Sequence, residues 1–165
     1  MPRDLGKPGD VPSAANTVLL IEDDTDTRDL LARVLSGEGF CVRLAANGWE
    51  GLLAVENPPD LILLDIMLPG MDGVSFLRSL RNTHGYDRVP VVVVTALDMD
   101  EIAPKVQPYG VEQIISKGDN LLGQLKTTLR RTLARPPRPN HVDPPGPDSS
   151  IRPCLELYFK MLAWG

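Results

Sequence analysis

The chain carries the stretch LILLDIMLPGMDG at residues 61–73. Its first four residues are aliphatic, and such a run predicts a short strand that is covered on both faces, as in the parallel sheets of α/β proteins. Asp65 follows this run directly and leads into a loop that contains Pro69 and Gly70. Because ligands of open parallel sheets bind beyond the carboxyl ends of the strands, Asp65 lies where a reactive carboxylate is expected.

Polar side chains also follow three other predicted strands. The run at 18–21 is followed by Glu22, Asp23 and Asp24, the run at 91–94 by Thr95, and the run at 114–116 by Lys117. From Asp23 onward through Asp65 and Thr95 to Lys117, the successive separations are 42, 30 and 22 residues. Each separation leaves room for crossover connections between parallel strands, so the four polar ends are expected to meet at one edge of a sheet.

The pattern predicts strands that alternate with helices. We expect five strands, near residues 17–22, 40–45, 60–65, 90–95 and 112–116. Helices are expected between and after the strands: the first uses Leu30, Leu31, Val34 and Leu35, and the second starts at Asn47. The third starts near Asp72 and buries Val74, Leu77 and Leu80. The fourth is shortened and distorted by Pro104 and Pro108, and the fifth runs from near Asp119 to about Ala134. This order predicts an α/β fold with a doubly wound five-stranded parallel sheet of flavodoxin-like order 2-1-3-4-5 and helices on both faces.

Over residues 17–134 the chain resembles the receiver domain of two-component response regulators, the CheY-like superfamily. The resemblance rests on the four polar strand ends in their order and on the loop at 68–73. It implies a phosphoacceptor switch, in which Asp65 takes a phosphoryl group from a phosphohistidine in a magnesium-dependent way. The implied partners are a sensor histidine kinase or phosphotransfer protein and a downstream protein, and a second copy of the chain is a further candidate. Beyond its own phosphorylation and dephosphorylation, no enzyme activity is expected.

The acidic side chains favour a hard divalent cation. Close carboxylates repel one another by roughly 4 kcal/mol per pair at an effective dielectric constant near 20, and oxygen-only ligands suit Mg²⁺. By resemblance, Asp23 and Asp65 bind the metal directly, Glu22 acts mainly through water, and the backbone carbonyl of Met67 is another ligand. The resemblance also assigns Thr95 and Lys117 to the phosphoryl group. The alternative is an acidic loop that caps the next helix, a role in which Asp24 or Thr25 is expected.

Two positions depart from the family pattern. Family members usually carry Pro directly after the Lys and often Tyr or Phe three residues before it, where this chain has Gly118 and Ile114. These changes put the output step in doubt and motivate an alternative function, a receiver-like interaction module that works without phosphorylation. A phosphohydrolase of the dehalogenase type is disfavoured, because the run at 24–28 has Arg28 where that motif needs Thr.

Composition and charge disfavour several other functions. The chain has 165 residues, 42% of them hydrophobic, and a net charge of -5, which is ordinary for one globular domain and favours neither nucleic acid nor an anionic membrane as a partner. The local basic stretch of Arg130, Arg131, Arg135 and Arg138 is interpreted as the solvated end of a helix. No Gly-rich phosphate loop follows a strand, so nothing in the sequence supports nucleotide binding. No run resembles a membrane span or a secretory signal, so the expected compartment is the cytoplasm.

The segments outside the predicted domain have their own character. We expect a flexible leader at 1–16, a Pro-rich linker at 135–150 and a short amphipathic tail at 151–165. Three alternatives stand for the tail: it docks on its own domain or on a second copy, it stays frayed, or it is the beginning of a truncated further domain. A DNA-binding output domain is not expected, since 31 residues follow Ala134 and many are Pro. Of the cysteines, Cys41 is expected to be buried in a core strand and Cys154 to be exposed in the tail.

Overall fold

The computed structural model describes residues 15–83 and 85–134. Within them a parallel sheet has the order β2-β1-β3-β4-β5, which confirms the predicted order 2-1-3-4-5. The strands are β1 (Thr17–Ile21), β2 (Cys41–Ala45), β3 (Leu61–Leu64), β4 (Val91–Thr95) and β5 (Gln113–Ser116). The helices are α1 (Thr25–Gly37), α2 (Gly48–Ala54), α3 (Gly73–Arg81), α4 (Met99–Val106) and α5 (Leu121–Leu133), with a 3-10 turn, η1 (Gln107–Tyr109). The predicted leader up to residue 14, the linker and the tail lie outside the described residues.

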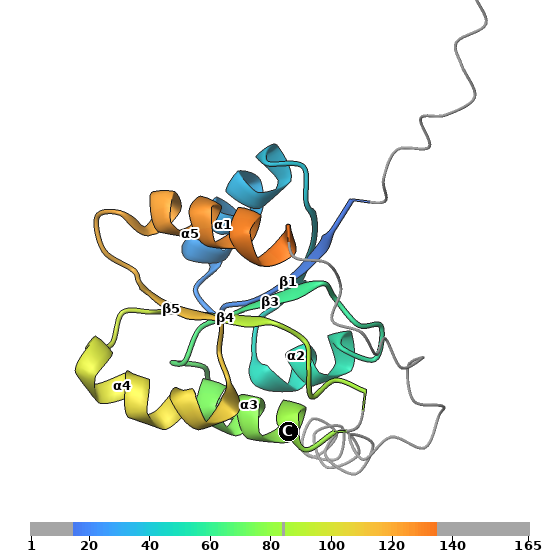
Figure 1. The fold of residues 1–165 in the computed structure, drawn as a ribbon, viewed down its shortest axis with the longest axis vertical. Coiled ribbons are helices and arrows are strands. Elements are labelled where there is room, and N and C mark those ends of the chain that lie inside the picture. The colour runs from blue at the N-terminus through green and yellow to red at the C-terminus, as the bar shows by residue number, and fades with distance from the viewer. Residues whose placement is uncertain (1–14, 84, 135–165) are drawn as a thin grey trace, which may run out of the picture.

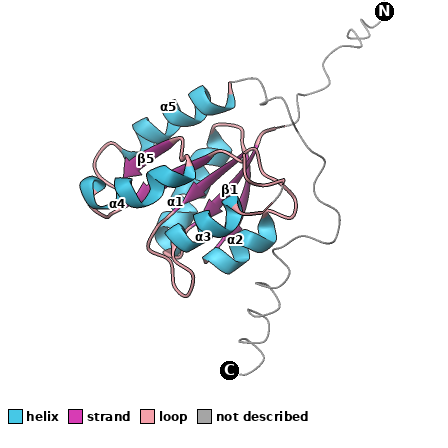
Figure 2. Ribbon diagram, turned by 60° about the horizontal axis from the view of Figure 1, so that its bottom comes forward, coloured by secondary structure: helices cyan, strands magenta, loops and turns pink. Residues whose placement is uncertain are grey.

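Helices cover both faces of the sheet. In Figure 1, α1 and α5 lie on one face and α2, α3 and α4 on the other. Figure 2 shows the same arrangement from another side, with the strands enclosed between the helices. Each helix returns the chain to the amino edge of the sheet, so the carboxyl ends of all the strands share the opposite edge.

Two hydrophobic cores explain the aliphatic runs of the central strands. Alternate residues of a strand face opposite sides, so Leu19 and Leu64 pack beneath α2, α3 and α4, while Leu20 and Leu63 pack beneath α1 and α5. All four residues of β3 are completely buried. A strand between two helical layers needs apolar residues at every position, which is why β3 shows no polar alternation.

Two expectations about individual burial were wrong, and one residue of an apolar pattern is exposed. Leu30 contributes to the apolar spacing that predicted the first helix, but it is 50% exposed. Cys41 is exposed rather than buried, because it lies on β2, the edge strand that pairs only with β1. In α3 Leu77 and Leu80 are fully buried as expected, and so is Phe76, whereas Val74 is only partly buried at the margin of the core.

The helix boundaries agree with the capping residues. Asn47 and Asp72 accept hydrogen bonds from the backbone N–H groups of Glu50 and Ser75, so they are the N-caps of α2 and α3. The expected distortion after β4 is also present, because α4 contains Pro104 and ends at Val106, where the chain tightens into η1. None of the helices in the described part of the chain combines the length and the apolar character that crossing a membrane requires.

Candidate functional site

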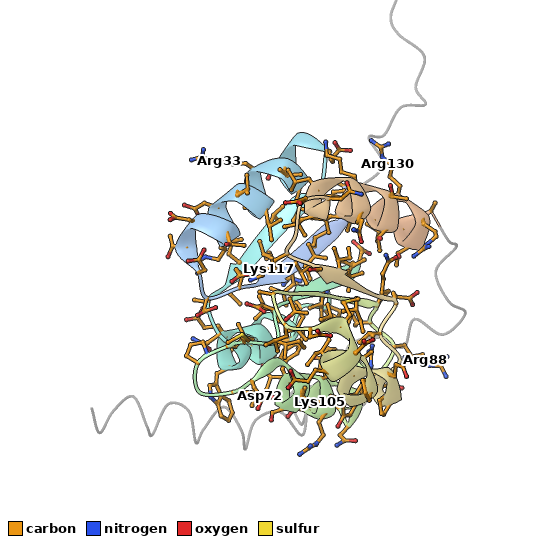
Figure 3. The ribbon with its side chains drawn as sticks, turned by 90° about the vertical axis from the view of Figure 1, so that its left-hand side faces the viewer. Arg33, Asp72, Arg88, Lys105, Lys117 and Arg130 are labelled. Atoms are coloured by element: carbon orange, nitrogen blue, oxygen red, sulfur yellow. The ribbon has the colours of Figure 1, made fainter. Side chains whose placement is uncertain are left out.

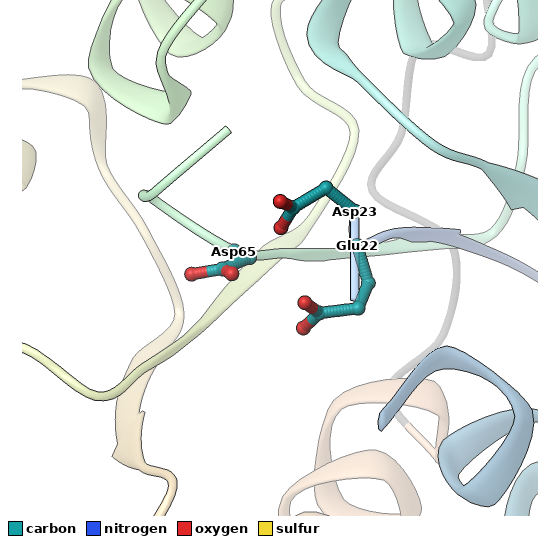
Figure 4. Close-up of side chains that lie close together, drawn as sticks. All are labelled: Glu22, Asp23 and Asp65. Carbon is teal, nitrogen blue, oxygen red and sulfur yellow. The ribbon is translucent and has the colours of Figure 1, made fainter. Parts of the chain in front are cut away.

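Three carboxylates meet at the carboxyl edge of the sheet. Glu22 and Asp23 follow β1, and Asp65 follows the adjacent β3, whose last residue pairs with the last residue of β1. One oxygen of each carboxylate lies within 4.8 Å of the others. Figure 4 shows the three side chains turned to the same side of the strand ends. The predicted convergence of these acidic residues is therefore present in the fold.

Lys117 connects two of these carboxylates. Its Nζ lies 2.9 Å from Asp65 Oδ2 and 2.6 Å from Glu22 Oε2. The backbone holds this lysine in place, since its N–H donates to the carbonyl of Thr95 at 2.8 Å and so extends the pairing of β5 with β4. In Figure 3, Lys117 lies near the middle of the molecule, at the level of the sheet, whereas Arg33 and Arg130 lie on the outer helices. An ammonium group therefore directly faces the carboxylate of Asp65.

Burial and charge shift the protonation of this ion pair. Burial raises the pKa of Glu22 above its ordinary value, and the charge of Asp65 raises it further, while the hydrogen bond and charge of Lys117 act in the opposite direction. For Lys117, burial alone lowers the pKa, but the hydrogen bonds and charges of Glu22 and Asp65 together outweigh it and the pKa is raised. The lysine is therefore an ammonium ion at neutral pH.

The oxygen atoms fit a hard divalent cation. Asp65 Oδ1 accepts from the N–H of Met67 at 3.2 Å and Glu22 Oε1 accepts from the N–H of Asp24 at 3.2 Å, so each oxygen of both side chains already has one protein donor. Each carboxylate oxygen still has a second lone pair to offer. Asp23 is exposed, and within residues 15–83 and 85–134 no group donates a hydrogen bond to its carboxylate. Three carboxylates around a single ammonium leave excess negative charge, which suits Mg²⁺.

Thr95 and Met67 have different surroundings. Thr95 is fully buried at the end of β4, and its hydroxyl accepts from the N–H of Leu97 at 3.2 Å rather than contacting Asp65 or the Lys117 side chain. The Met67 side chain is 58% exposed beside the site, and its contact with Asp65 is made through its own N–H. The proposed ligand role of the Met67 carbonyl and the phosphoryl contact of Thr95 stay predictions.

Asp24 has the capping role expected for it. Its carboxylate accepts from the N–H of Thr27 at 2.8 Å and caps α1. Hydrogen bonding with Thr27, through its side chain first and its backbone N–H second, lowers the pKa of Asp24. Asp24 therefore stands apart from the acidic pair. Sequence reasoning missed Arg28, whose Nη1 donates to the carbonyls of Glu22 at 2.9 Å and Asp23 at 3.3 Å. Nothing in the pattern of the sequence pointed to this contact, because it depends on how the chain turns between β1 and α1.

Residues 18–127 match the family model of the response regulator receiver domain. The chain belongs to this family. The receiver domain accounts for the fold and for the order of polar strand ends, and it makes the chain part of the two-component class of proteins.

Curated relatives carry names of the same class. The chain is 35% identical over 153 residues to the response regulator MprA of Mycobacterium sp. (strain KMS), a match that covers 85% of this chain and 58% of the relative. It is 36% identical over 123 residues to the DNA-binding response regulator MtrA of Mycolicibacterium paratuberculosis, covering 72% of this chain and 53% of the relative. The chain thus spans about half the length of the curated relatives it matches. DNA binding is stated in the name of MtrA, which contrasts with the expectation of no nucleic-acid partner, although the matched part here is the receiver domain.

Solved structures agree with the fold. The chemotaxis protein CheY4 of Vibrio cholerae has a TM-score of 0.67 and 27% identity, with 73% of this chain and 100% of that one covered. The receiver domain of a sensor histidine kinase from Pseudomonas aeruginosa has a TM-score of 0.68 and 27% identity, with 74% and 100% covered. The latter structure holds a magnesium ion in its active site cleft.

Proposed function

We propose that this receiver domain is a phosphoacceptor switch of a two-component phosphorelay, with Asp65 as the residue that is phosphorylated. The observation that carries the proposal is the contact of 2.9 Å between Lys117 Nζ and Asp65 Oδ2, beside the cluster of three carboxylates. The phosphoryl donor is the phosphohistidine of a sensor histidine kinase or phosphotransfer protein, because MprA and MtrA, as response regulators, belong to two-component systems.

The chemistry follows from the groups around Asp65. An oxygen of its carboxylate attacks phosphorus, the phosphorus–nitrogen bond of the donor histidine breaks, and the leaving imidazole nitrogen takes the electron pair and a proton from solvent water. Lys117 already contacts this carboxylate, so its ammonium is within reach of the phosphoryl oxygens on which charge develops. The buried hydroxyl of Thr95, at the end of the neighbouring strand, accepts from the N–H of Leu97 and would donate its own proton to a phosphoryl oxygen.

A metal ion completes the proposed site. Asp23 and Asp65 would bind Mg²⁺ directly, the Met67 carbonyl would be a further ligand, and Glu22, which is held by Lys117, would act through water. When bound, Mg²⁺ neutralises charge on the transferring phosphoryl group. Positioning and charge neutralisation are the main contributions that a protein makes to phosphoryl transfer.

The output is proposed to be a protein contact. The domain would catalyse only its own phosphorylation and dephosphorylation, act in the cytoplasm without contacting nucleic acid or a membrane, and signal to a downstream protein or to a second copy of itself. The net charge of -5 supports this choice over nucleic acid or an anionic membrane.

Phosphotransfer profiling against the kinases of the host tests the proposal. The wild-type chain should acquire an acyl phosphate label, and Asp65→Asn should acquire none, because the amide is not a nucleophile. Asp72→Asn is the matched control: Asp72 lies in the same loop but caps α3 through Ser75, and Asn caps a helix equally well. Label at full stoichiometry on Asp65→Asn would refute the assignment.

One observation favours a second candidate, an interaction module that works without phosphorylation. Ile114 occupies the position on β5 where family members often carry Tyr or Phe, so that aromatic side chain is absent here. Ile114 is partly buried against the core beneath α2, α3 and α4. Binding to a partner, or self-association measured by sedimentation, should be compared with and without beryllofluoride and Mg²⁺. Equal association in both conditions supports the second candidate, and stronger association with the phosphoryl mimic supports the switch.

A further inference from the structure

Arg28 binds the loop that carries the acidic pair. It lies in the first turns of α1, is half-buried, and donates from one guanidinium nitrogen, Nη1, to the carbonyls of Glu22 at 2.9 Å and Asp23 at 3.3 Å. Its other terminal nitrogen, Nη2, lies 3.5 Å from the hydroxyl of Thr25. One cationic side chain thus contacts three residues of the short stretch that joins β1 to the start of α1.

The two carbonyls belong to the peptide units on either side of Asp23. The Glu22 carbonyl is part of the planar unit before the Asp23 Cα, and the Asp23 carbonyl is part of the unit after it. Holding both units restricts φ and ψ at Asp23 and therefore the direction of its Cα–Cβ bond. This matters because the Asp23 carboxylate is exposed, and within the described residues 15–83 and 85–134 no hydrogen bond to it exists that would orient it directly.

The position of Arg28 is unfavourable for the helix itself. A cation near the amino end of a helix opposes the helix dipole, whereas the neighbouring Asp24 and Asp26 suit it. The contacts with the two carbonyls and with the acidic loop explain why a cation is tolerated there. Nη1 binds both carbonyls while Nη2 reaches the Thr25 hydroxyl, and the single nitrogen of a lysine cannot make both sets of contacts at once.

We propose that Arg28 is a positioning residue that aims Asp23 at the metal and so sets the affinity for Mg²⁺. This inference rests on the proposed function, in which Asp23 is a direct metal ligand. Partners that orient a metal ligand typically change metal affinity by about 10 to 100-fold when they are removed. Loss of the guanidinium should therefore weaken Mg²⁺ binding by about 10-fold or more, without removing any ligand atom.

Calorimetric Mg²⁺ titration of Arg28→Met, Arg28→Lys and the wild type tests this role. Arg33→Met is the matched control, because Arg33 is an exposed arginine of the same helix. We expect a Mg²⁺ dissociation constant about 10-fold higher for Arg28→Met, an intermediate value for Arg28→Lys, and the wild-type value for Arg33→Met. Phosphorylation by a small acyl phosphate should fall at limiting Mg²⁺ and recover at saturating Mg²⁺, because Asp65 and Lys117 do not contact Arg28.

The outcomes separate the two proposals. A wild-type chain that binds no Mg²⁺ overturns the proposed function and this inference together. A wild type that binds Mg²⁺, with both Arg28 variants within about twofold of its affinity, overturns the inference alone. Loss of phosphorylation that persists at saturating Mg²⁺ also overturns it, because that loss indicates general damage to the fold. If Arg28→Met does not fold, the affinity of the charge-conserving Arg28→Lys decides.

Discussion

At the residue scale, the ammonium group of Lys117 compensates the negative charge of two carboxylates that the fold has largely removed from water. Glu22 is 1% exposed and Asp65 is 5% exposed, and both lie against the ammonium group. Burying a carboxylate without a partner is costly, so removing a shared partner leaves two charged groups uncompensated. The lysine therefore contributes to stability before any phosphoryl chemistry takes place.

Lys117→Met should lower the free energy of unfolding by about 1 to 3 kcal/mol in the absence of Mg²⁺. The cause is the loss of the only ammonium group bound to the Glu22 and Asp65 carboxylates in the described residues. Urea denaturation measures the effect. Lys105→Met is the control, since Lys105 forms an exposed pair with Glu101 and should change stability by less than about 1 kcal/mol. Equal effects of the two substitutions would contradict the prediction.

Gly73 allows the backbone after β3 to pass close to α3. A Cβ at this position would lie 2.6 Å from the Asp65 carbonyl oxygen and 2.7 Å from the Ile66 Cα, and backbone cannot move aside as a flexible side chain does. Gly73→Ala should therefore displace the Asp65 loop, cost about 1 to 3 kcal/mol of unfolding free energy and reduce phosphorylation.

Gly118→Ala is the control for that substitution. A Cβ at Gly118 would meet only the Ser116 hydroxyl, at an ordinary 3.6 Å, so stability should be close to wild type. Thermal denaturation and the phosphorylation assay should be run on both variants. Wild-type behaviour of Gly73→Ala in both assays would show that the loop has room that the packing does not indicate.

At the element scale, Glu38 links two helices on the same face of the sheet. It is the C-cap residue of α1, and its carboxylate lies 2.9 Å from Lys126 Nζ and 2.8 Å from Arg130 Nη2, both on α5. The hydrogen bond from Lys126, followed by that from Arg130, lowers the pKa of Glu38. Part of the basic stretch predicted to be merely solvated thus has a structural partner.

This link should make stability depend on pH. The pKa of Glu38 is lower in the folded chain than in the unfolded one, so its stabilisation is present above the ordinary value of 4.5 and is lost as the pH falls through the lower, folded value. Glu38→Gln should therefore reduce the denaturation midpoint at about pH 7 and change it much less at about pH 3. Glu101→Gln, which removes a pair within α4, is the control. A Glu38→Gln effect that grows toward acid pH would have the wrong sign.

At the scale of the whole molecule, the site joins the ends of strands that are distant in the sequence. Glu22 and Asp23 follow β1, Asp65 follows β3, and Lys117 follows β5 at the far edge of the sheet. Groups on separate strands come together only when the sheet has formed. A cation that binds them therefore binds the folded chain and not the unfolded one, and it should stabilise the whole domain.

Mg²⁺ should accordingly raise the thermal midpoint of the wild-type chain. At about 100 times its dissociation constant, a ligand of the folded state contributes about 2.7 kcal/mol. Asp23→Ala should lose most of this response. Asp24→Asn should keep it, because Asp24 caps α1 and Asn is an equally good cap. An equal Mg²⁺ response of Asp23→Ala and wild type would remove Asp23 from the ligand set.

The sheet and the meeting of the polar strand ends were predictable from the sequence. Aliphatic runs such as 61–64 identify strands covered on both faces, and the alternation of strands with helices restricts the chain to a parallel order. In a parallel sheet the strand ends then share one edge, whatever the details of packing. The caps at Asn47 and Asp72 were also predictable, because capping depends on residues within one turn.

Other features were decided by contacts between distant segments. The exposure of Cys41 follows from the edge position of β2. The full burial of Phe76 and the partial burial of Val74 follow from the way α3 lies on the sheet. Lys117 pairs with Glu22 because its side chain reaches from the end of β5 to the end of β1. The hydrogen bonds from Arg28 to the carbonyls of Glu22 and Asp23 depend in the same way on how the chain turns between β1 and α1. Periodicity and capping are local properties that a sequence displays directly, whereas burial and pairing depend on which neighbours the folded chain brings against each side chain.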